Sequence, residues 1–467
     1  MDPALSLAVA AGKVTAATIR RLGRGGGTTL PGRVSARIDG RALEKLSSRL
    51  ASGSILVAGT NGKTTTSTLL RTILVEAGTS IVANSAGSNM VGGLTAAVVA
   101  RAGVGGAANA EAGVFEVDEA SLPAAVAAIS PRLVVVTNLF RDQLDRYGEL
   151  ESSSAAISSA LAALPSAATA LLCADDPRVA AMGEGLRARV VYFGLEDPGA
   201  AEAVVPHAAD ARFCPRCGRP FTFERVYAGH LGHYRCPAGD FARPAPDLRA
   251  TAITFDGLDA QAITLSGAGF DDTLLEVPLS GVYNSYNILA AAGAAALFGV
   301  APSEVARAVR TFRPAFGRLE KVDIEGRSVR LMLAKNPAGF NEVLRASRVL
   351  GGGRKFLVAL NDRIADGRDV SWIWDVDFEL LSDAESIVVA GDRALDMCVR
   401  MKYAGLDPGR IAVAEAPGAA IDALLANSAP GDEVFVLPTY TAMLDLRAEM
   451  ASRGYLEPYW LEGSRGR

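Results

Sequence analysis

The sequence predicts an α/β protein with three parts: a central domain with a phosphate-binding loop on a parallel sheet, a cysteine-rich insert, and a C-terminal α/β domain. Apolar runs that end in polar residues alternate with helical patterns from residue 54 onward, which is typical of a parallel sheet with helices on both faces. The alternation stops between residues 206 and 246, where Cys, His and aromatic residues gather. A second series of strands follows residue 320.

Composition limits the classes of function. The chain has 467 residues, 49% of them hydrophobic, and is long enough for two or three domains that each bury a core. Its 47 basic and 51 acidic residues nearly balance, so we expect no nucleic-acid partner. Five cysteines, two of them in one Cys-x-x-Cys pair, indicate a reducing compartment rather than a disulfide framework. No stretch predicts a membrane span or a secretion signal, so we expect a cytoplasmic protein.

Each predicted part has its own pattern. Residues 1–53 form an N-terminal segment with a basic, glycine-rich loop and a short amphipathic helix at RALEKLSSRL. Residues 54–320 form the central domain, whose predicted strands include SILVAG, AGVFEVDEA, RLVVVTN and TALLCADD. The insert spans residues 206–246. Residues 321–467 form a Rossmann-like domain with the predicted strands FLVALND, SIVVAGD, RIAVAEAP and EVFVLPTYT. We expect the active groups at the carboxyl ends of the parallel strands.

The most specific motif is ILVAGTNGKTTTSTLL, in which a strand runs into a glycine-rich turn and then a helix. The backbone N–H groups of such a turn cradle phosphate, Lys63 would reach the outer phosphates, and the hydroxyl of Thr64 would bind Mg²⁺. Val57 stands where the general pattern has its first glycine, so the loop is a tighter variant. A turn without a ligand is the alternative. The predicted ATP-binding loop consists of Gly59, Thr60, Asn61, Gly62, Lys63, Thr64 and Thr65.

This tighter loop, GTNGKTT, resembles that of the Mur ligase and folylpolyglutamate synthetase family, ATP-dependent ligases that form an acyl phosphate and then an amide. The resemblance implies that Glu116 in VFEVDEASL helps to hold Mg²⁺. It implies nucleotide contacts from Asn284 and Asn287 in GVYNSYNILAAA and from Arg318 in FGRLE. The stretch VVTNLFRDQLDRYGEL is similar to a further family motif and would place four residues near the substrate, namely Asn138, Asp142, Gln143 and Asp145.

The chain also departs from the family pattern. Gln143 and Tyr283 stand where the family has histidines. No lysine occurs between Lys63 and Lys321, so the carbamylated lysine that many Mur ligases use beside a second Mg²⁺ is not expected in the central domain. We expect one Mg²⁺ ion, and the sequence does not decide whether a second one is used. Residues 1–53 leave no room for the domain that holds the uridine nucleotide in ordinary Mur ligases, and we expect a lipid-linked substrate instead.

The insert, CPRCGRPFTFERVYAGHLGHYRCPAGDF, has the spacing of a zinc ribbon in which one ligand is replaced. A structural zinc site takes four ligands, commonly from two Cys-x-x-Cys knuckles. Cys214 and Cys217 form the first knuckle. The second keeps only Cys236, because Gly239 stands where the fourth cysteine should be.

A noncysteine residue could complete this zinc site. We predict Asp240 as the fourth ligand, with His233 and His230 as alternatives. An insert that has lost its metal and stands on its aromatic residues is a further alternative. A catalytic zinc is not favoured, because no base lies nearby in the sequence. The remaining cysteines, Cys173 and Cys398, lie in apolar surroundings and are expected in the core.

Together with the insert, the C-terminal stretches AKNPAGFNEVL, ALNDRIADGRDVSWIWD and LPTYTAML resemble the MurT family, the ligase subunits of lipid II isoglutaminyl synthase. The resemblance covers nearly the whole chain. It implies a heterodimer with a GatD-like class I glutaminase, which releases ammonia from glutamine. It also implies that the ligase uses ATP to amidate the α-carboxylate of D-glutamate in the lipid II stem peptide, at the inner face of the cell membrane. Lys335 and Asn336 are then expected near the substrate.

The stretch ADGRDVSWIWDVDFE carries five carboxylates around two tryptophans. Trp372 and Trp374 alternate with an isoleucine, so one face of a short strand or turn is expected to pack inward. The carboxylates are too many to bury unpaired, and several should face water or a partner. The family resemblance implies that the ligase lends an acid to the catalytic histidine of its glutaminase. We predict Asp369 for this role ahead of Asp366, because Gly367 lets the loop turn and expose a carboxylate.

Two other functions remain open from the sequence. A folylpolyglutamate synthetase-like ligase would share the phosphate loop, but it gives no reason for the cysteine-rich insert or the acidic tryptophan stretch. A nucleotide-binding scaffold that regulates a partner without chemistry is favoured by Gln143 and Tyr283. ATP turnover that depends on glutamine and lipid II would distinguish the amidating ligase from a folylpolyglutamate synthetase-like ligase and from a scaffold.

Overall fold

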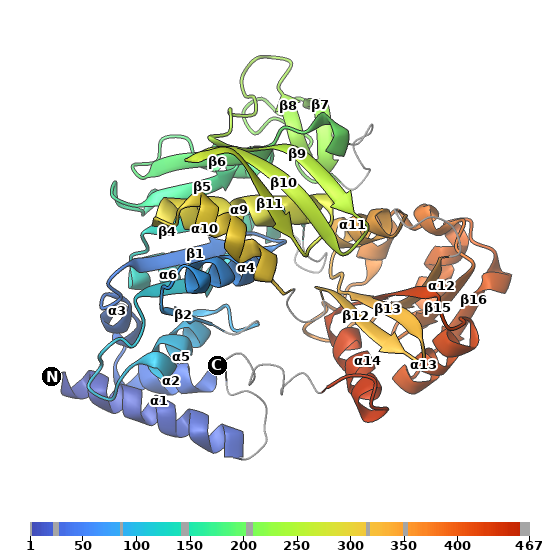
Figure 1. The fold of residues 1–467 in the computed structure, drawn as a ribbon, viewed down its shortest axis with the longest axis horizontal. Helices are drawn as coiled ribbons and strands as arrows, with labels where there is room; N and C mark the ends of the chain where they lie inside the picture. The colour runs from blue at the N-terminus through green and yellow to red at the C-terminus, as the bar shows by residue number, and fades with distance from the viewer. Residues whose placement is uncertain are drawn as a thin grey trace.

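The computed structural model describes residues 2–21, 28–84, 87–141, 149–201, 209–313, 318–348 and 354–457, except for the side chains of residues 149, 318 and 319. Within these ranges the chain forms two large sheets and a separate two-stranded hairpin (Figure 1). The larger sheet belongs to the first two thirds of the chain and the smaller one to the last third. The predicted α/β fold class is confirmed.

Nine strands in the order β11-β10-β9-β6-β5-β4-β1-β3-β2 form the central sheet. All neighbours from β2 to β9 are parallel. The last two pairings, β9 with β10 and β10 with β11, are antiparallel, and the sequence patterns did not predict them. The strands are β1 (Gly53–Ala58), β2 (Ile81–Ala83), β3 (Ala112–Glu116), β4 (Leu133–Val136), β5 (Thr169–Cys173), β6 (Arg189–Leu195), β9 (Leu248–Asp256), β10 (Ala260–Gly267) and β11 (Phe270–Val277).

Helices bury the middle of this sheet. The strands β1, β3, β4 and β5 are buried along almost their whole length, as continuous apolar runs predict for a sheet covered on both faces. Helices α4 (Lys63–Glu76) and α9 (Val282–Phe298) pack side by side, with α10 (Pro302–Ala308) beside them. Helix α6 (Leu122–Ile129) packs against α7 (Glu149–Ala162).

The N-terminal helices form a layer beyond the β2 edge of the sheet (Figure 1). Helix α1 lies on α2, and α2 lies on α5. A side chain at Gly32 of α2 would collide with the backbone at Gly92 of α5, so glycine permits this close approach. The helices are α1 (Pro3–Arg21), α2 (Leu30–Ile38), α3 (Ala42–Ser47) and α5 (Val91–Arg101).

The C-terminal sheet has the strand order β12-β13-β17-β14-β15-β16, with all pairs parallel except β12 and β13. Two hydrophobic clusters cover its two faces. The strands are β12 (Arg318–Ile324), β13 (Arg327–Met332), β14 (Lys355–Ala359), β15 (Ser386–Ala390), β16 (Ile411–Ala414) and β17 (Glu433–Pro438). The helices are α11 (Pro337–Ser347), α12 (Ala394–Tyr403), α13 (Pro417–Ala426) and α14 (Tyr440–Ser452).

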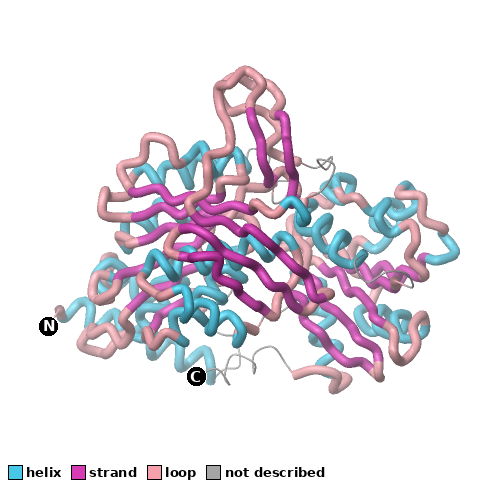
Figure 2. The backbone as a smooth tube through the Cα atoms, turned by 45° about the horizontal axis from the view of Figure 1, so that its top comes forward, coloured by secondary structure: helices cyan, strands magenta, loops and turns pink. Residues whose placement is uncertain are grey.

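The cysteine-rich insert folds between β6 and β9 as a hairpin of β7 (Thr222–Ala228) and β8 (Leu231–Arg235), which Figure 2 shows projecting beyond the central sheet. It has a small core of its own that contains Cys214, Cys236 and three aromatic rings. Within the described ranges no helix is long and apolar enough to cross a membrane.

Candidate functional site

The predicted phosphate loop joins the end of β1 to the start of α4. Gly59 and Gly62 have φ angles of +121° and +84°, in the region that favours glycine. A side chain at Gly62 would also collide with the amide oxygen of Asn287 on α9. Because α4 begins at Lys63, the N–H groups of its first turn and the helix dipole favour an anion at this loop. The local geometry is that of a phosphate site.

Lys63 is held beside the loop by an acidic residue that the sequence analysis did not single out. Its ammonium lies 2.5 Å from the carbonyl oxygen of Gly59 and 2.7 Å from a carboxylate oxygen of Glu119. Glu119 follows β3 in a short 3₁₀ helix. An anion that binds Lys63 would therefore share its ammonium with Glu119, so Glu119 belongs to the candidate site.

Glu116 ends β3 and is almost buried. Its backbone N–H donates to the Asn84 side chain, and the Asn84 amide donates back to its carbonyl oxygen, at 3.0 and 2.9 Å. Among the described residues its carboxylate has neither a hydrogen-bond nor an ion-pair partner. A carboxylate fixed at its backbone and unpaired at its oxygens suits a cation. Thr64, the other predicted Mg²⁺ ligand, is half-buried at the start of α4.

Asn138 binds the phosphate loop itself. Its side-chain oxygen accepts from the Asn61 N–H at 2.9 Å, and its amide donates to the Asn61 carbonyl oxygen at 3.1 Å. The hydroxyl of Thr60 donates to the Phe140 carbonyl oxygen and accepts from the Phe140 N–H, both at 3.0 Å. The segment after β4 therefore fixes the loop. The predicted residues Asp142, Gln143 and Asp145 lie outside the described residues.

The two predicted asparagines of α9 form a chain of hydrogen bonds. Asn284 donates to the Ser280 carbonyl oxygen at 2.7 Å, and Asn287 donates to the side-chain oxygen of Asn284 at 3.0 Å. Asn287 also accepts from the Thr66 hydroxyl at 3.4 Å. These bonds orient both amides beside the phosphate loop. Thr65 is buried at the same place.

A cavity of about 110 Å³ lies where the phosphate loop, α9, the turn of the insert hairpin and α11 meet. Across it, the amide of Asn336 donates to the side-chain oxygen of Asn61 at 3.0 Å, and the side-chain oxygen of Asn336 caps α11 at Gly339. Lys335 precedes it and is half-buried. The cavity thus lies between residues of the central and C-terminal domains. Its lining includes Asn61, Asn138, Phe140, Tyr283, Asn284, Asn287, Met332, Glu342 and Val343.

Arg318 is the first residue of β12 in the C-terminal sheet. Its backbone is described, but its side chain lies outside the described parts of the chain. Its predicted contact with phosphate therefore stays a prediction.

The two candidate acids of the DGRD loop have different surroundings. Asp366 is 2% exposed, and it accepts from both the N–H and the hydroxyl of Thr441 at the start of α14. Burial raises the pKa of Asp366. Asp369 is partly exposed, accepts from the Ser371 N–H at 2.8 Å, and lines an open groove of about 300 Å³ with Trp374 and Arg393. The geometry favours Asp369 as the acid that a partner can reach.

The tryptophan stretch around this groove is a 3₁₀ helix at Ser371–Asp375 and not a strand. Trp372 is buried against Phe340, whereas Trp374 is 51% exposed and packs edge-on against Tyr403. Only one tryptophan therefore belongs to the core. Two other large apolar side chains are exposed at the groove: Val399 lines it, and Tyr403 packs against Trp374.

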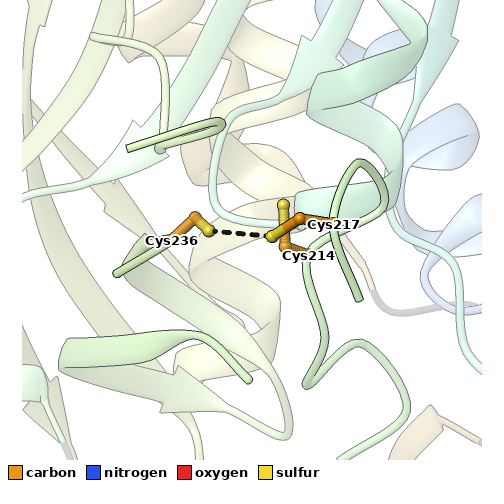
Figure 3. A group of neighbouring side chains, drawn as sticks. All are labelled: Cys214, Cys217 and Cys236. Atoms are coloured by element: carbon orange, nitrogen blue, oxygen red, sulfur yellow. Dashed lines mark hydrogen bonds between the residues drawn. The ribbon is translucent and has the colours of Figure 1, made fainter. Parts of the chain in front are cut away.

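Three thiols of the insert converge (Figure 3). The sulfurs of Cys214, Cys217 and Cys236 all lie within 4.8 Å of one another, and those of Cys217 and Cys236 are 3.4 Å apart. A hydrogen bond with the carboxylate of Asp240 raises the pKa of Cys217 to about 12. Burial opposes the shift at Cys236, but the N–H of Ala238 and other nearby donors hold the pKa of that thiol below its usual value.

The three thiols suit Zn²⁺, which takes four ligands in a structural site. Asp240 interacts with Cys217 but is not part of the group of three, so its role as the fourth ligand stays a prediction. The alternative histidine ligands are engaged elsewhere. His230 lies 3.2 Å from a carboxylate oxygen of Asp176, and His233 lies 2.8 Å from the carbonyl oxygen of Leu195. Both histidines thus have other partners, and Asp240 stays the predicted fourth ligand. Cys173 is buried in the central core as predicted, and Cys398 is partly buried against the C-terminal core.

Comparisons with known proteins agree with this geometry. A family model described as Mur ligase middle domain matches residues 57–214, and one described as MurT ligase C-terminal matches residues 333–443. Two relatives are named lipid II isoglutaminyl synthase (glutamine-hydrolyzing) subunit MurT. The one from Staphylococcus aureus is 32% identical over 86% of this chain and 88% of its own length. The one from Streptococcus pneumoniae is 31% identical over 97% and 98%.

The fold has known counterparts as well. The solved structure of a pseudomurein peptide ligase type C from Methanothermus fervidus aligns with a TM-score of 0.67 over 87% of this chain and 80% of that one. Its sequence is 20% identical, so the likeness concerns the fold alone.

Proposed function

Since the chain belongs to the MurT family, we propose that it is the ATP-dependent ligase subunit of a lipid II isoglutaminyl synthase. A GatD-like glutaminase hydrolyses glutamine to glutamate and ammonia. The ligase transfers the γ-phosphoryl group of ATP to the α-carboxylate of D-glutamate in the stem peptide, which releases ADP. Ammonia then attacks the acyl phosphate, phosphate leaves, and the amide of D-isoglutamine forms. The lipid carrier of the substrate places the reaction at the inner face of the cell membrane.

One observation carries this proposal: the phosphate loop and α9 of the central domain meet residues of the C-terminal domain around one cavity. The loop and the start of α4 supply N–H groups for phosphate, and Lys63 supplies the charge. Asn284 and Asn287 line the same cavity, and Asn336, which caps α11, donates to Asn61 of its lining. ATP bound there contacts both domains. A phosphoryl transfer depends mainly on such positioning and charge stabilisation.

Thr64 and Glu116 are the residues that would hold Mg²⁺. When bound, Mg²⁺ supplies positive charge that neutralises the phosphate oxygens. The unpaired, almost buried carboxylate of Glu116 fits this role among the described residues. Lys63 stabilises the charge on the transferred phosphoryl group, and Asn138 keeps the loop in place through its bonds to Asn61. No lysine of the central domain other than Lys63 is available for carbamylation.

The partner surface is proposed at the groove that Asp369 lines. Aromatic and aliphatic side chains are exposed around it, including Trp374 and Tyr403, and such residues are enriched at protein interfaces. At this surface Asp369 would supply the carboxylate that the catalytic histidine of the glutaminase needs. This carboxylate would accept a hydrogen bond from the histidine, set its tautomer and stabilise the imidazolium.

The experiment that tests the function is ATP turnover in the reconstituted complex. We expect the chain and a GatD-like glutaminase to convert ATP to ADP only when lipid II and either glutamine or ammonium are present. Turnover without lipid II, or with a folate substrate in its place, would contradict an amidating ligase. Binding of ATP without any turnover in the complete mixture would support the scaffold instead.

The thiol cluster gives a second prediction. We expect the purified chain to contain about one Zn²⁺ per molecule, bound by Cys214, Cys217, Cys236 and Asp240. Cys214→Ser should remove most of the metal and lower the melting temperature, because a structural site contributes its binding energy to folding. Cys398→Ser, which changes a thiol outside the cluster, should leave the metal content unchanged.

Elemental analysis and a thermal melt check this prediction. A chain without zinc before mutation, with a Cys214→Ser variant as stable as the Cys398→Ser control, would show that the insert has lost its metal.

A further inference from the structure

The cysteine-rich insert forms part of the nucleotide cavity. The turn of its hairpin, with Ala228, Gly229 and Leu231, lines the same cavity as Asn61 and Gly62 of the phosphate loop. Gly229 has a φ of +60°, and a side chain there would collide with the ring of Phe140. The turn is therefore fitted closely against the segment that follows β4. An element far from the loop in the sequence thus lines the cavity in which we propose that ATP binds.

His230 connects this turn to the central domain. The residue is fully buried, and its ring lies 4.3 Å from that of Phe140, measured between centroids. Its Nε2 lies 3.2 Å from a carboxylate oxygen of Asp176. The same oxygen of Asp176 accepts from the Leu139 N–H at 2.7 Å. His230 therefore contacts the segment 139–140 twice, once through a ring and once through a shared carboxylate.

That segment in turn holds the phosphate loop. The Thr60 hydroxyl exchanges two hydrogen bonds of 3.0 Å with the backbone of Phe140. The Thr60 N–H donates to the carbonyl oxygen of Asn138 at 2.9 Å. A short path of direct contacts thus runs from the hairpin turn through His230 and Phe140 to Thr60.

The chemistry of His230 is more than packing. Although burial would raise the pKa of Asp176, His230 and the N–H groups of Leu139 and Val179 lower it, so this carboxylate only accepts hydrogen bonds. The Nε2 of His230 is therefore the donor. Its Nδ1 is buried with no hydrogen-bond partner among the described residues, which costs folding free energy. A phenylalanine would avoid that cost but would leave the buried carboxylate of Asp176 without the His230 donor, so both the ring and the hydrogen bond of His230 count at this position.

Other contacts fix the hairpin on the side away from the phosphate loop. The Gly232 N–H donates to the Asp175 carbonyl oxygen at 2.9 Å, and the Tyr234 hydroxyl donates to the Ala174 carbonyl oxygen at 3.1 Å. Tyr234 also packs in the small core that contains Cys214 and Cys236. The thiol cluster thus supports the base of the hairpin whose turn reaches the cavity.

We propose that His230 is a positioning residue for ATP, through which the cysteine-rich insert sets the affinity of the ligase for its nucleotide. This inference rests on the proposed function, because it assumes that the cavity binds ATP. His230 holds Leu139 and Phe140, these residues hold Thr60, and the loop is preorganised for phosphate. Without His230, ATP binding must order this segment, and affinity falls.

The test compares four variants on the full chain in complex with a GatD-like glutaminase. His230→Ala removes the ring and the donor, His230→Phe keeps only a ring, and His230→Gln keeps only an N–H donor. His233→Ala is the matched control, since His233 lies on the same hairpin but bonds the carbonyl oxygen of Leu195. The dissociation constant is measured by calorimetry with a non-hydrolysable ATP analogue, and KM is measured for ATP and for glutamine.

We expect His230→Ala to weaken binding of the analogue roughly tenfold or more, with KM for ATP raised and KM for glutamine unchanged. His230→Phe and His230→Gln should each recover part of the affinity, and His233→Ala should bind like the unchanged protein. Thermal melts identify any variant that fails to fold. If His230→Ala fails to fold, the affinities of His230→Phe and His230→Gln for the analogue test the inference instead.

Two results would overturn the inference. In the first, the His230 variants bind the analogue as tightly as His233→Ala. In the second, they raise KM for glutamine by the same factor as the dissociation constant for the analogue. Failure of the proposed function looks different. In that case the unchanged protein and the His233→Ala control do not bind the analogue, and Lys63→Ala makes no further difference.

Discussion

Lys63→Ala is expected to reduce amidation and ATP turnover by a factor on the order of 10² or more, because the ammonium is needed most where charge builds on the transferred phosphoryl group. The side chain is 8% exposed, lies beside the first residues of α4, and pairs with Glu119 at 2.7 Å. The fold and the complex with the glutaminase should remain intact, since the groove of Asp369 belongs to the C-terminal sheet domain. Steady-state ADP release and gel filtration of the complex measure both effects.

The control for this variant is Lys13→Ala, which removes a lysine from α1 in the N-terminal helical layer (Figure 1). It should keep full turnover. Near-normal turnover of Lys63→Ala would contradict the assignment of the phosphate site. Equal loss in both variants would indicate damage to the fold rather than to the site.

Asp369→Asn is expected to lower glutamine hydrolysis in the complex by a factor on the order of 10² to 10⁴, the range seen when the acid that orients a catalytic histidine is neutralised. Asp369 lines the open groove, and its carboxylate accepts from the N–H and the side chain of the nearby Ser371. Amidation driven by a high concentration of free ammonium should survive, because the ATP cavity is formed by other residues. Glutamate release and ammonium-driven ADP release separate the two activities.

Asp366→Asn is the matched comparison for this variant. Asp366 is buried and bonds Thr441 at the start of α14, so its change should lower stability more than it changes glutamine hydrolysis. If Asp366→Asn abolishes glutamine hydrolysis while Asp369→Asn leaves it unchanged, the choice between the two acids is wrong. If both variants hydrolyse glutamine normally, the loop is core or docking surface only.

The features that sequence could predict depend on neighbours in the chain. The phosphate loop is contiguous, and its glycines, lysine and following helix identify it without tertiary information. The converging thiols follow from fixed spacing within one small insert. Alternating apolar runs predict the parallel strands, because their burial pattern is local.

The features that were missed depend on contacts between distant segments. Glu119 pairs with Lys63 across 56 positions of sequence, and His230 meets Asp176 across 54. No local pattern marks such a pair. Asp175 and Asp176 at the end of TALLCADD could have indicated such a contact, because buried acids need hydrogen-bond or ion-pair partners. The tryptophan stretch was ambiguous for another reason: the alternation that suggests a strand also occurs in a 3₁₀ helix that buries Trp372 and Ile373 and exposes Trp374.

We propose that this chain amidates the stem peptide of lipid II with nitrogen from glutamine. This amidation is tested most directly by mass spectrometry of lipid II after incubation with the chain, a GatD-like glutaminase, MgATP and glutamine whose amide nitrogen is isotopically heavy. We expect an amide group with heavy nitrogen to replace the hydroxyl of the D-glutamate α-carboxyl group. Lys63→Ala should prevent this incorporation. Lipid II of unchanged mass in the complete mixture, while ATP binding and glutamine hydrolysis both proceed, would contradict the proposal.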